Sequence, residues 1–155
     1  MFKLFIRAHD LGVKNEENIS AKLNELGLDG VQLVAYKALD CVAYAPASIT
    51  AERAESFSDC FKRNGKSVPL IGAYFNPVHP NEEKILNGIA VFKDYLTLCH
   101  SFGCNIVGSE TGSYNGDKWT YHPQNRTEEA LKKVIETFLE LCAFAKEPVS
   151  YTHLR

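Results

Sequence analysis

The stretch CNIVGSETGSYNGDKWTYHP, residues Cys104 to Pro123, joins a short apolar run to a carboxylate, Glu110, and then to a long loop of glycine, aromatic and polar residues. A buried strand that finishes on a charged residue is typical of a (β/α) barrel. In that architecture the binding site is built at the carboxyl ends of the parallel strands. If the chain is such a barrel, its other strands are expected to end in the same way.

Three further strand-like runs lie upstream, and each also leads into polar residues. The four runs cover residues 3–9, 30–36, 68–76 and 104–110, and each is short and nearly continuously apolar. This is the pattern of parallel strands covered on both faces. The polar residues at their ends are His9 and Asp10, Tyr36 and Lys37, Asn76 and His79, and Glu110 and Thr111.

Helical patterns separate these runs, with acidic residues in the first turns and glycine beyond the last turns, as helix ends favour. The predicted helices cover 18–26, a segment from the N-cap Thr50 to Gly65, 81–102, and a segment starting at Thr127. The residues predicted to face the core are Ile19, Leu23 and Leu26 in the first, Ile85, Ile89, Phe92, Leu96 and Cys99 in the third, and Leu131, Val134, Phe138, Leu141 and Ala145 in the last.

The order βαβαβαβα predicts an α/β fold with a parallel sheet and right-handed crossovers. A doubly wound nucleotide-binding sheet would have a glycine-rich turn after the first strand, but HDLGVKNEEN contains one glycine. The barrel is therefore favoured. A complete barrel has eight units and about 250 residues. We therefore predict a (βα)4 portion of a TIM (β/α)8 barrel, truncated before the fifth strand.

Composition restricts the class of protein and its partners. The 155 residues are 45% hydrophobic and 23% charged with a formal net charge of −2, which indicates a globular domain. Without a basic stripe or a long apolar run, we expect neither a nucleic-acid nor a membrane partner. Five cysteines without a CxxC pair, in a chain that opens on a strand-like run rather than a signal peptide, predict reduced thiols and a cytoplasmic location.

Four blocks resemble the N-terminal half of the xylose isomerase-like barrel family, and specifically bacterial sugar phosphate isomerases/epimerases. They are RAHDLG, LDGVQLVAYKAL, LIGAYFNPVHPNEEK and VGSETGSYNGDKWTYHPQNRTEEAL. The resemblance covers residues 1–147. The ending PVSYTHLR does not fit a barrel and is similar to translated adapter or vector sequence. We therefore expect residues 148–155 to be a non-native tail.

The resemblance implies an activity and a cofactor. Members of this family move a carbonyl along a sugar, or invert a neighbouring carbon, through proton abstraction and a metal-stabilised enediolate. They bind a divalent metal (Mn, Mg, Co or Zn) through Glu, Asp, His and Glu on strands five to eight, where the catalytic residues also lie. The fragment is therefore expected to bind no metal and to be inactive alone, and its partner is expected to be a small sugar or sugar phosphate.

The residues at the strand ends and in the long loop are the candidates for substrate binding. Glu110 is expected at the mouth of the barrel, His9 at its rim, and Asn76 and His79 in a proline-stiffened loop. The long loop is interpreted as a lid whose Trp119 and His122 close over a sugar while Arg126 reaches a phosphate. Each has a structural alternative, such as a cap, a solvent-facing turn or an aromatic plug.

Two other functions stay open. An endonuclease-IV-like phosphoesterase from the same wider group of barrels is disfavoured by the acidic charge balance and by too few histidines for a multi-zinc site. The alternative of a different class is a non-catalytic half-barrel that functions by self-association or by pairing with a second chain. Its open sheet edges would then be covered by the partner.

Overall fold

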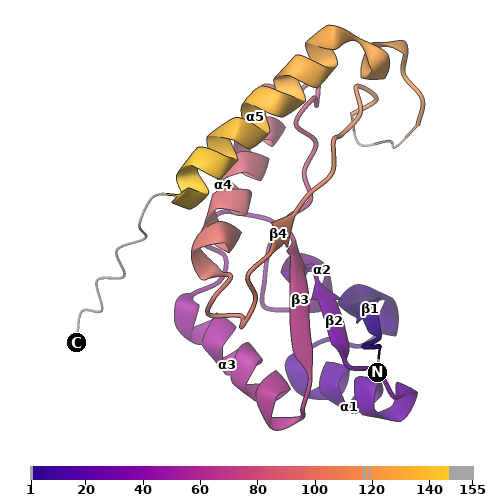
Figure 1. The fold of residues 1–155 in the computed structure, drawn as a ribbon, viewed down its shortest axis with the longest axis vertical. Coiled ribbons are helices and arrows are strands. Elements are labelled where there is room, and N and C mark those ends of the chain that lie inside the picture. Colours follow the sequence, from indigo (N-terminus) through magenta and orange to yellow (C-terminus); the bar gives the residue numbers. More distant parts are fainter. Residues whose placement is uncertain (1, 117, 119, 147–155) are drawn as a thin grey trace, which may run out of the picture.

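The structure, a computed structural model, describes residues 2–116, 118 and 120–146 (Figure 1). Two features predicted from the sequence, the side chain of Trp119 and the tail at 148–155, lie outside these residues. The described part is a curved parallel sheet with its helices outside it and a long arm formed by the β4–α5 connection.

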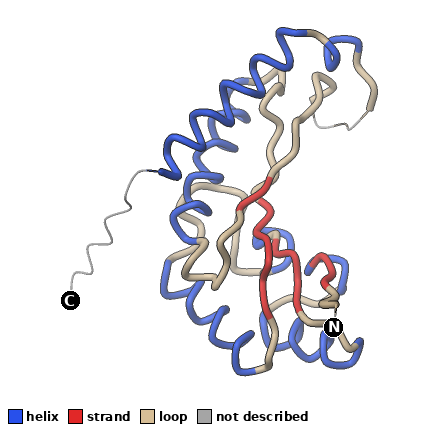
Figure 2. Tube along the Cα trace, in the orientation of Figure 1, coloured by secondary structure: helices blue, strands red, loops and turns tan. Residues whose placement is uncertain are grey.

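The sheet contains four parallel strands in the order β1-β2-β3-β4, drawn in red in Figure 2. The register pairs Ile6 with Val31, Leu33 with Ile71, and Ile71 with Val107. The predicted parallel α/β portion of a barrel is therefore confirmed. The strands are β1 (Phe5–Arg7), β2 (Gly30–Leu33), β3 (Ser67–Gly72) and β4 (Val107–Gly108).

The helices begin close to the residues that the sequence indicates. The N-caps Asn15, Thr50 and Asn81 each accept a hydrogen bond from a backbone N–H in the first turn of their helix. The predicted Thr50 cap is therefore confirmed. The helices are α1 (Glu16–Leu26), α2 (Ala35–Ala38), α3 (Ala51–Arg63), α4 (Glu82–Leu98) and α5 (Glu128–Lys146), with 3-10 turns η1 (Ala8–Leu11) and η2 (Pro123–Arg126).

All four strands are shorter than predicted, and this changes the setting of the polar residues. His9 lies in the 3-10 turn η1, and Tyr36 lies in the short helix α2, not in a strand. The chain leaves β2 because the amides of Lys37 and Ala38 bond back to the carbonyl of Val34. The polar side chains are thus presented by short turns directly beyond the carboxyl ends of the strands.

Two aromatic clusters fill the space between the helices and the sheet. Phe57 stacks on Phe61 with ring centroids 4.4 Å apart, and Phe102 meets Phe57 edge-on at 5.8 Å. Phe92 lies 6.1 Å from Phe75, and Phe138 packs on both rings to join α5 to this second cluster. The clusters fix α3, α4 and α5 relative to the sheet.

Three predicted core positions are wrong. Leu131 on α5 is 60% exposed, Leu26 at the end of α1 is 48% exposed, and Ala145 is also exposed. Leu26 is the last residue of its helix, and Gly27 turns the chain away with φ 66°. On α5 the packing face is formed by Val134, Phe138 and Leu141. Leu131 shares a different side with Ile135 and Leu139, four and eight residues further on, and this side faces outward.

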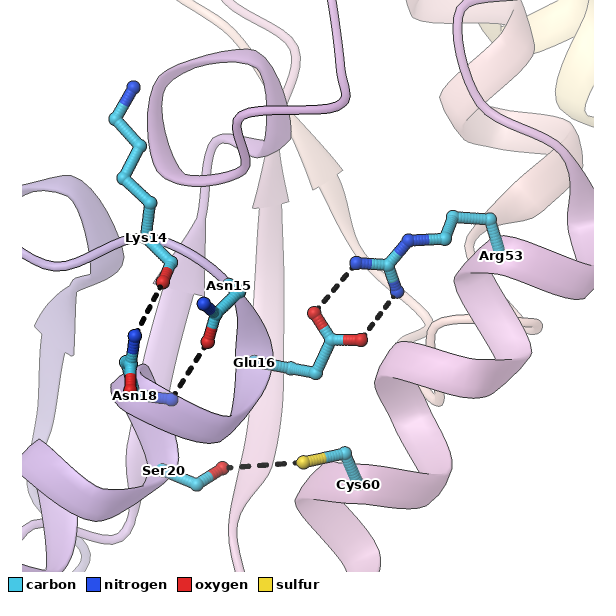
Figure 3. Close-up of polar contacts among 7 residues, drawn as sticks. All are labelled: Lys14, Asn15, Glu16, Asn18, Ser20, Arg53 and Cys60. Carbon is cyan, nitrogen blue, oxygen red and sulfur yellow. Dashed lines mark hydrogen bonds and ion pairs between the residues drawn. The ribbon is translucent and has the colours of Figure 1, made fainter.

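One buried ion pair joins the first two crossover helices (Figure 3). Arg53 on α3 donates from both terminal nitrogens to the two carboxylate oxygens of Glu16 on α1, each at 2.6 Å. The Glu16 side chain is 8% exposed and that of Arg53 is 31% exposed. Burial is the largest single influence and raises the pKa of Glu16. The hydrogen bonds from Arg53, a backbone hydrogen bond to the carboxylate and the positive charge of Arg53 together lower that pKa by more, so the carboxyl stays ionised below its ordinary range.

All five cysteines are free thiols. Three of them, Cys60, Cys99 and Cys104, are buried, whereas Cys41 and Cys142 are exposed. Three of the five side chains are therefore packed in the interior. Within the described residues, no helix is long and apolar enough to span a membrane.

Candidate functional site

A cavity of about 560 Å³ opens beyond the carboxyl ends of β2, β3 and β4. Its volume falls within the range of about 300–1,000 Å³ that is usual for small-molecule sites. Four aromatic side chains form one part of its lining, namely Tyr36, Tyr44, Tyr74 and Phe75. The polar lining consists of Lys37, Asn76, His79, Glu83, Lys84, Asn87 and Glu110.

The aromatic wall is held by a ring contact within it and by two polar neighbours, Lys37 and Gln32. The rings of Tyr36 and Tyr44 lie 4.7 Å apart at 55°, and the Lys37 ammonium lies 5.7 Å from the centre of the Tyr36 ring. The hydroxyl of Tyr74 accepts a hydrogen bond from the side-chain amide of Gln32 on β2. Tyr74 is thus anchored to the neighbouring strand, while Tyr44 comes from the α2–α3 loop.

The hydroxyls of Tyr36 and Tyr44 stay protonated at neutral pH, because the pKa of each is raised. Burial raises the pKa of Tyr36, and the negative charge of Glu110 and the nearby Tyr74 raise it further. Burial raises the pKa of Tyr44 to about 12, with a smaller contribution from Tyr36. A neutral phenol both donates and accepts hydrogen bonds, so the wall offers donors as well as ring faces to a ligand.

A glycine makes room for the Tyr74 ring. A Cβ at Gly72 would lie 2.6 Å from the Cε2 atom of Tyr74 and 2.9 Å from a methyl group of Val34. Both contacts are closer than packed carbon atoms tolerate. The last residue of β3 is therefore glycine because the ring of the pocket wall lies directly against the strand.

Asn76 acts as a clamp between the β3–α4 loop and the β4–α5 arm. Its Nδ2 donates to the carbonyls of Ser113 at 2.6 Å and Gly116 at 2.9 Å. Its Oδ1 accepts from the amides of Ser113 at 3.0 Å and Val78 at 3.1 Å. These bonds occupy both donors and both acceptor positions of the amide. Asn76 lines the cavity as predicted, but its polar atoms are used to hold the two loops together.

The clamp requires a glycine opposite it. Gly112 has φ 83°, and a Cβ there would overlap the Oδ1 atom of Asn76. Neither the backbone conformation nor the space suits a larger residue. The two loops are therefore built to meet closely at this point, which fixes the rim of the cavity.

His79 is buried at the base of the same loop. Its Nδ1 accepts a hydrogen bond of 2.8 Å from the backbone amide of Asn81, the N-cap of α4. A neutral ring with Nδ1 as acceptor bears its proton on Nε2. A Cβ at Gly116 would lie 3.4 Å from that Nε2 atom, so the arm packs over the ring. His79 thus lies in the cavity wall as predicted, under the tip of the clamped arm.

Glu110, the residue that ends the fourth strand-like run, is exposed and lines the cavity. The preceding residue, Ser109, accepts a hydrogen bond at its hydroxyl from the amide of Phe75, at 3.3 Å. This bond continues the pairing of the β3 and β4 chains past the last strand residues. Glu110 therefore follows a residue that is tied to the β3 chain, and its side chain lies at the mouth of the cavity.

His9 lies beside the cavity and is not part of its lining. Its Nε2 is 3.8 Å from a carboxylate oxygen of Asp10, and its buried Nδ1 has no hydrogen-bond partner within the described residues. Burial lowers the pKa of His9 more than Asp10 raises it, and the positive charges of Lys37 and Arg7 lower it further. The ring is therefore mostly neutral at pH 7.

The long loop forms an arm that is braced by its own side chains. Asn115 donates to Thr120 and to the carbonyl of Tyr121, and Asn125 accepts from the amide of Tyr114. These bonds link the two sides of the arm. A closing lid was predicted here; the described geometry is that of a loop with internal supports.

Two predicted residues of this arm do not line the cavity. The ring of His122 stacks at 5.9 Å on Tyr114, and the guanidinium of Arg126 lies 5.7 Å over the ring of Tyr121, which is 72% exposed. Trp119, the third, is outside the described residues. The structure thus brings Asn76, His79 and Glu110 together at one cavity, places His9 next to it, and holds His122 and Arg126 away from it.

Several lining residues were missed by sequence reasoning. Tyr74 precedes Asn76 by two residues in an extended segment, and this spacing places both on one side of the chain, which is a usable signal. Asn87 is one turn into the body of α4, and Tyr44 lies in an irregular loop. Neither has a local pattern that indicates a site, because only the tertiary fold brings them to the strand ends.

No cluster of three or more His, Cys, Asp or Glu side chains with the spacing of a metal site occurs among the described residues. Glu83 and Glu110 line the cavity with His79, but they do not form such a group. The described half of the fold therefore does not fit a divalent metal, and a metal site is not assigned to it.

The sequence matches the family model described as xylose isomerase-like TIM barrel over residues 20–149. This match covers most of the chain. The chain belongs to this family. No curated protein matches the chain in sequence. The predicted resemblance is therefore confirmed at the level of the family.

Solved structures show the same fold. A Rhodospirillum rubrum protein assigned as a xylose isomerase superposes with a TM-score of 0.68 at 20% identity, over 94% of this chain and 51% of that one. D-psicose 3-epimerase from Clostridium cellulolyticum H10, solved with D-tagatose, gives 0.64 at 15% identity, over 93% and 48%. The 3-keto-D-glucoside 4-epimerase of E. coli gives 0.55 at 18% identity, over 92% and 52%. The chain thus spans about half the length of these structures.

Proposed function

We propose that the cavity is the sugar-binding side of a sugar or sugar-phosphate isomerase or epimerase. The observation that supports this most is the composition of the cavity at the strand ends, where an aromatic wall faces a few carboxylate, amide and ammonium groups. A sugar presents both C–H faces and hydroxyl groups, so it needs ring surfaces and paired donors and acceptors. The epimerases among the structures of similar fold add support for the reaction class.

The described residues bind and orient the substrate in this proposal. The Tyr36 ring provides a surface for a sugar face, and the Glu110 carboxylate accepts hydrogen bonds from hydroxyl groups. The Asn76 clamp holds the rim of the cavity in place, so the ligand meets a preformed site. Proton abstraction next to the carbonyl belongs to residues outside this set.

A divalent metal, Mn, Mg, Co or Zn, is part of the proposal for the whole barrel, where it would stabilise the negative charge of an enediolate. The described residues do not supply its ligands, so no step is assigned to it here. We propose further that residues 1–147 are the N-terminal half of that barrel and that residues 148–155 are not native to it.

The test begins with the gene. Sequencing past the codon for Glu147 is expected to reveal a frame that encodes a fifth strand. The longer protein, incubated in D₂O with ketoses and Mn²⁺, is expected to incorporate deuterium next to the sugar carbonyl, as read by NMR. A Glu110→Ala variant should raise KM more than it lowers kcat, because Glu110 binds and does not abstract the proton. Full-length protein without exchange on any sugar would overturn the proposal.

A second candidate, self-association, is favoured by the exposed apolar side chains at both edges of the sheet. Phe2 and Leu4 are exposed next to β1, and Ile106 is exposed next to β4. On the β4 side, Leu131, Ile135 and Leu139 add an outward apolar stripe on α5. Two copies related by a twofold axis would pair each β1 with the partner's β4, and this pairing would cover the exposed apolar side chains at both edges of the sheet.

Sedimentation analysis of the 155-residue chain tests this candidate. A concentration-dependent dimer is expected, and Ile135→Glu on the stripe should make it monomeric. Leu86→Glu provides the control, because Leu86 is 59% exposed, against 48% for Ile135, and lies on α4 rather than on the α5 stripe. A monomer at all soluble concentrations, or equal effects of the two substitutions, would exclude the candidate.

A further inference from the structure

The charges that line the cavity are balanced. Among the described lining residues, Lys37 and Lys84 provide two ammonium groups, and Glu83 and Glu110 provide two carboxylates. No arginine is among them. A phosphate ester brings a charge of about −1.5 to −2 near pH 7, and it would enter between carboxylates as well as ammonium groups. The described wall therefore has no excess positive charge to receive it.

Two arginine side chains that could bind a phosphate, Arg126 and Arg53, are engaged in other contacts. Arg126, the residue predicted to reach a phosphate, lies over Tyr121 on the arm. Arg53 donates hydrogen bonds from both terminal nitrogens to the carboxylate of Glu16. Bidentate arginine contacts are the strong form of phosphate recognition, and neither guanidinium lines the cavity.

The amino end of α4 faces the cavity, but it is already neutralised. Asn81 caps the backbone amide of Glu83 at 2.8 Å, and Glu82 and Glu83 place two carboxylates in the first turn. Acidic residues at this position offset the positive end of the helix dipole. The helix end therefore offers neither a free first-turn amide at Glu83 nor a positive potential that would attract a second anion.

The same wall suits a neutral ligand. Tyr36, Tyr44 and Phe75 present ring faces, the phenol hydroxyls stay protonated, and Asn87 adds a side-chain amide from α4. Neutral hydroxyl groups can pair with these donors and with Glu110 without leaving a charge uncompensated. Hydrogen bonds to a charged acceptor such as Glu110 are stronger than those between neutral groups.

From these features we infer that the cavity takes an unphosphorylated monosaccharide and discriminates against the phosphate ester of the same sugar. The inference rests on the proposed function and narrows its substrate class. The carboxylates of Glu83 and Glu110 provide the discrimination, because they accept hydroxyl groups and repel a phosphate. The aromatic wall provides affinity that does not depend on charge.

Saturation-transfer NMR and calorimetry on the 155-residue chain test this inference with D-fructose, D-tagatose and D-xylulose and with a phosphate ester of each. At pH 7.5 and low ionic strength, at least one free sugar is expected to bind at least tenfold more tightly than its phosphate ester. Glu83→Gln is expected to reduce this ratio severalfold by strengthening phosphate binding. Glu17→Gln on α1 removes an exposed carboxylate away from the cavity and should leave the ratio unchanged.

The outcomes separate the inference from the proposed function. A phosphate ester that binds as tightly as the free sugar or more tightly would overturn the inference and leave a sugar site standing. If none of the six compounds binds, both the inference and the sugar-binding function of this cavity fail. If Glu83→Gln and Glu17→Gln change the ratio of free-sugar affinity to phosphate-ester affinity equally, the cavity carboxylates are not the source of the discrimination.

Discussion

Removing one member of the Glu16–Arg53 pair is expected to destabilise the protein more than removing an exposed ion pair of the same length. Arg53→Met keeps most of the aliphatic stem but leaves the Glu16 carboxylate, 8% exposed, without its guanidinium. Breaking a buried pair in this way costs about 3–5 kcal/mol. Because the Arg53 side chain is 31% exposed, water can reach the carboxylate, and we expect a loss of about 2–3 kcal/mol.

The Lys93–Glu140 pair provides the matched control. Its N–O distance is also 2.6 Å, but the Glu140 side chain is 53% exposed. Glu140→Gln should therefore cost no more than about 1 kcal/mol. Replacing both members of the buried pair, as Glu16→Leu with Arg53→Met, should cost less than Arg53→Met alone, because no buried charge is then left without a partner.

Urea unfolding followed by circular dichroism measures these differences. The pH dependence adds a second check, since the Glu16 pKa is lowered from 4.5 in the folded protein. Such a carboxyl stabilises the folded state above 4.5, and this contribution is lost as the pH falls through the lower folded pKa. The difference in unfolding free energy between wild type and Arg53→Met should therefore become smaller under acid conditions. If Arg53→Met lowers the unfolding free energy at neutral pH by no more than Glu140→Gln does, the reasoning is refuted.

Three further perturbations test the cavity rim. Asn76→Ala removes four hydrogen bonds and should lower the unfolding free energy by about 2–4 kcal/mol, while increasing proteolytic cleavage within the arm. Gly112→Ala should lower the unfolding free energy by about 2 kcal/mol or more in the wild-type background, and by clearly less when Asn76 is already alanine. Equal losses of unfolding free energy in the two backgrounds would contradict the clamp. NMR titration should give His9 a pKa below 6.5, so the stability that its neutral ring contributes to the folded state falls as the pH drops below 6.5. A pKa above 6.5 would contradict the effect of burial on this ring.

Much of the fold follows from local pattern. Thr50 and Asn81 predict helix starts because their side chains accept first-turn amides, which is a local interaction. The four apolar runs predict the parallel order because sequential strands joined by helices are neighbours in such sheets. The strand ends were predicted less well. The one-turn helix at Tyr36 depends on backbone bonds to Val34 that apolar periodicity does not reveal.

The site was predictable only where its residues follow strands directly. Asn76 and Glu110 follow β3 and β4 and line the cavity. Arg126 and His122 are separated from β4 by the long arm, and their partners, Tyr121 and Tyr114, lie within it. The sequence indicates that these side chains exist near the strand end but does not determine which way the arm turns them. The exposure of Leu131 on α5 could not be predicted either, because helical periodicity alone does not specify which of two apolar sides of a helix packs inward.

The most direct test of the central claim is to map sugar binding on the chain by ¹H–¹⁵N NMR. Titration with the tightest-binding monosaccharide should shift the amides around Tyr36, Tyr74, Asn87 and Glu110, which line one cavity from four separate segments of the chain. A Tyr36→Ala variant should weaken binding, whereas Tyr121→Ala on the arm should not. Shifts confined to the arm around Tyr121 or to the α5 stripe would contradict the account, because the sugar would then bind outside the strand-end cavity.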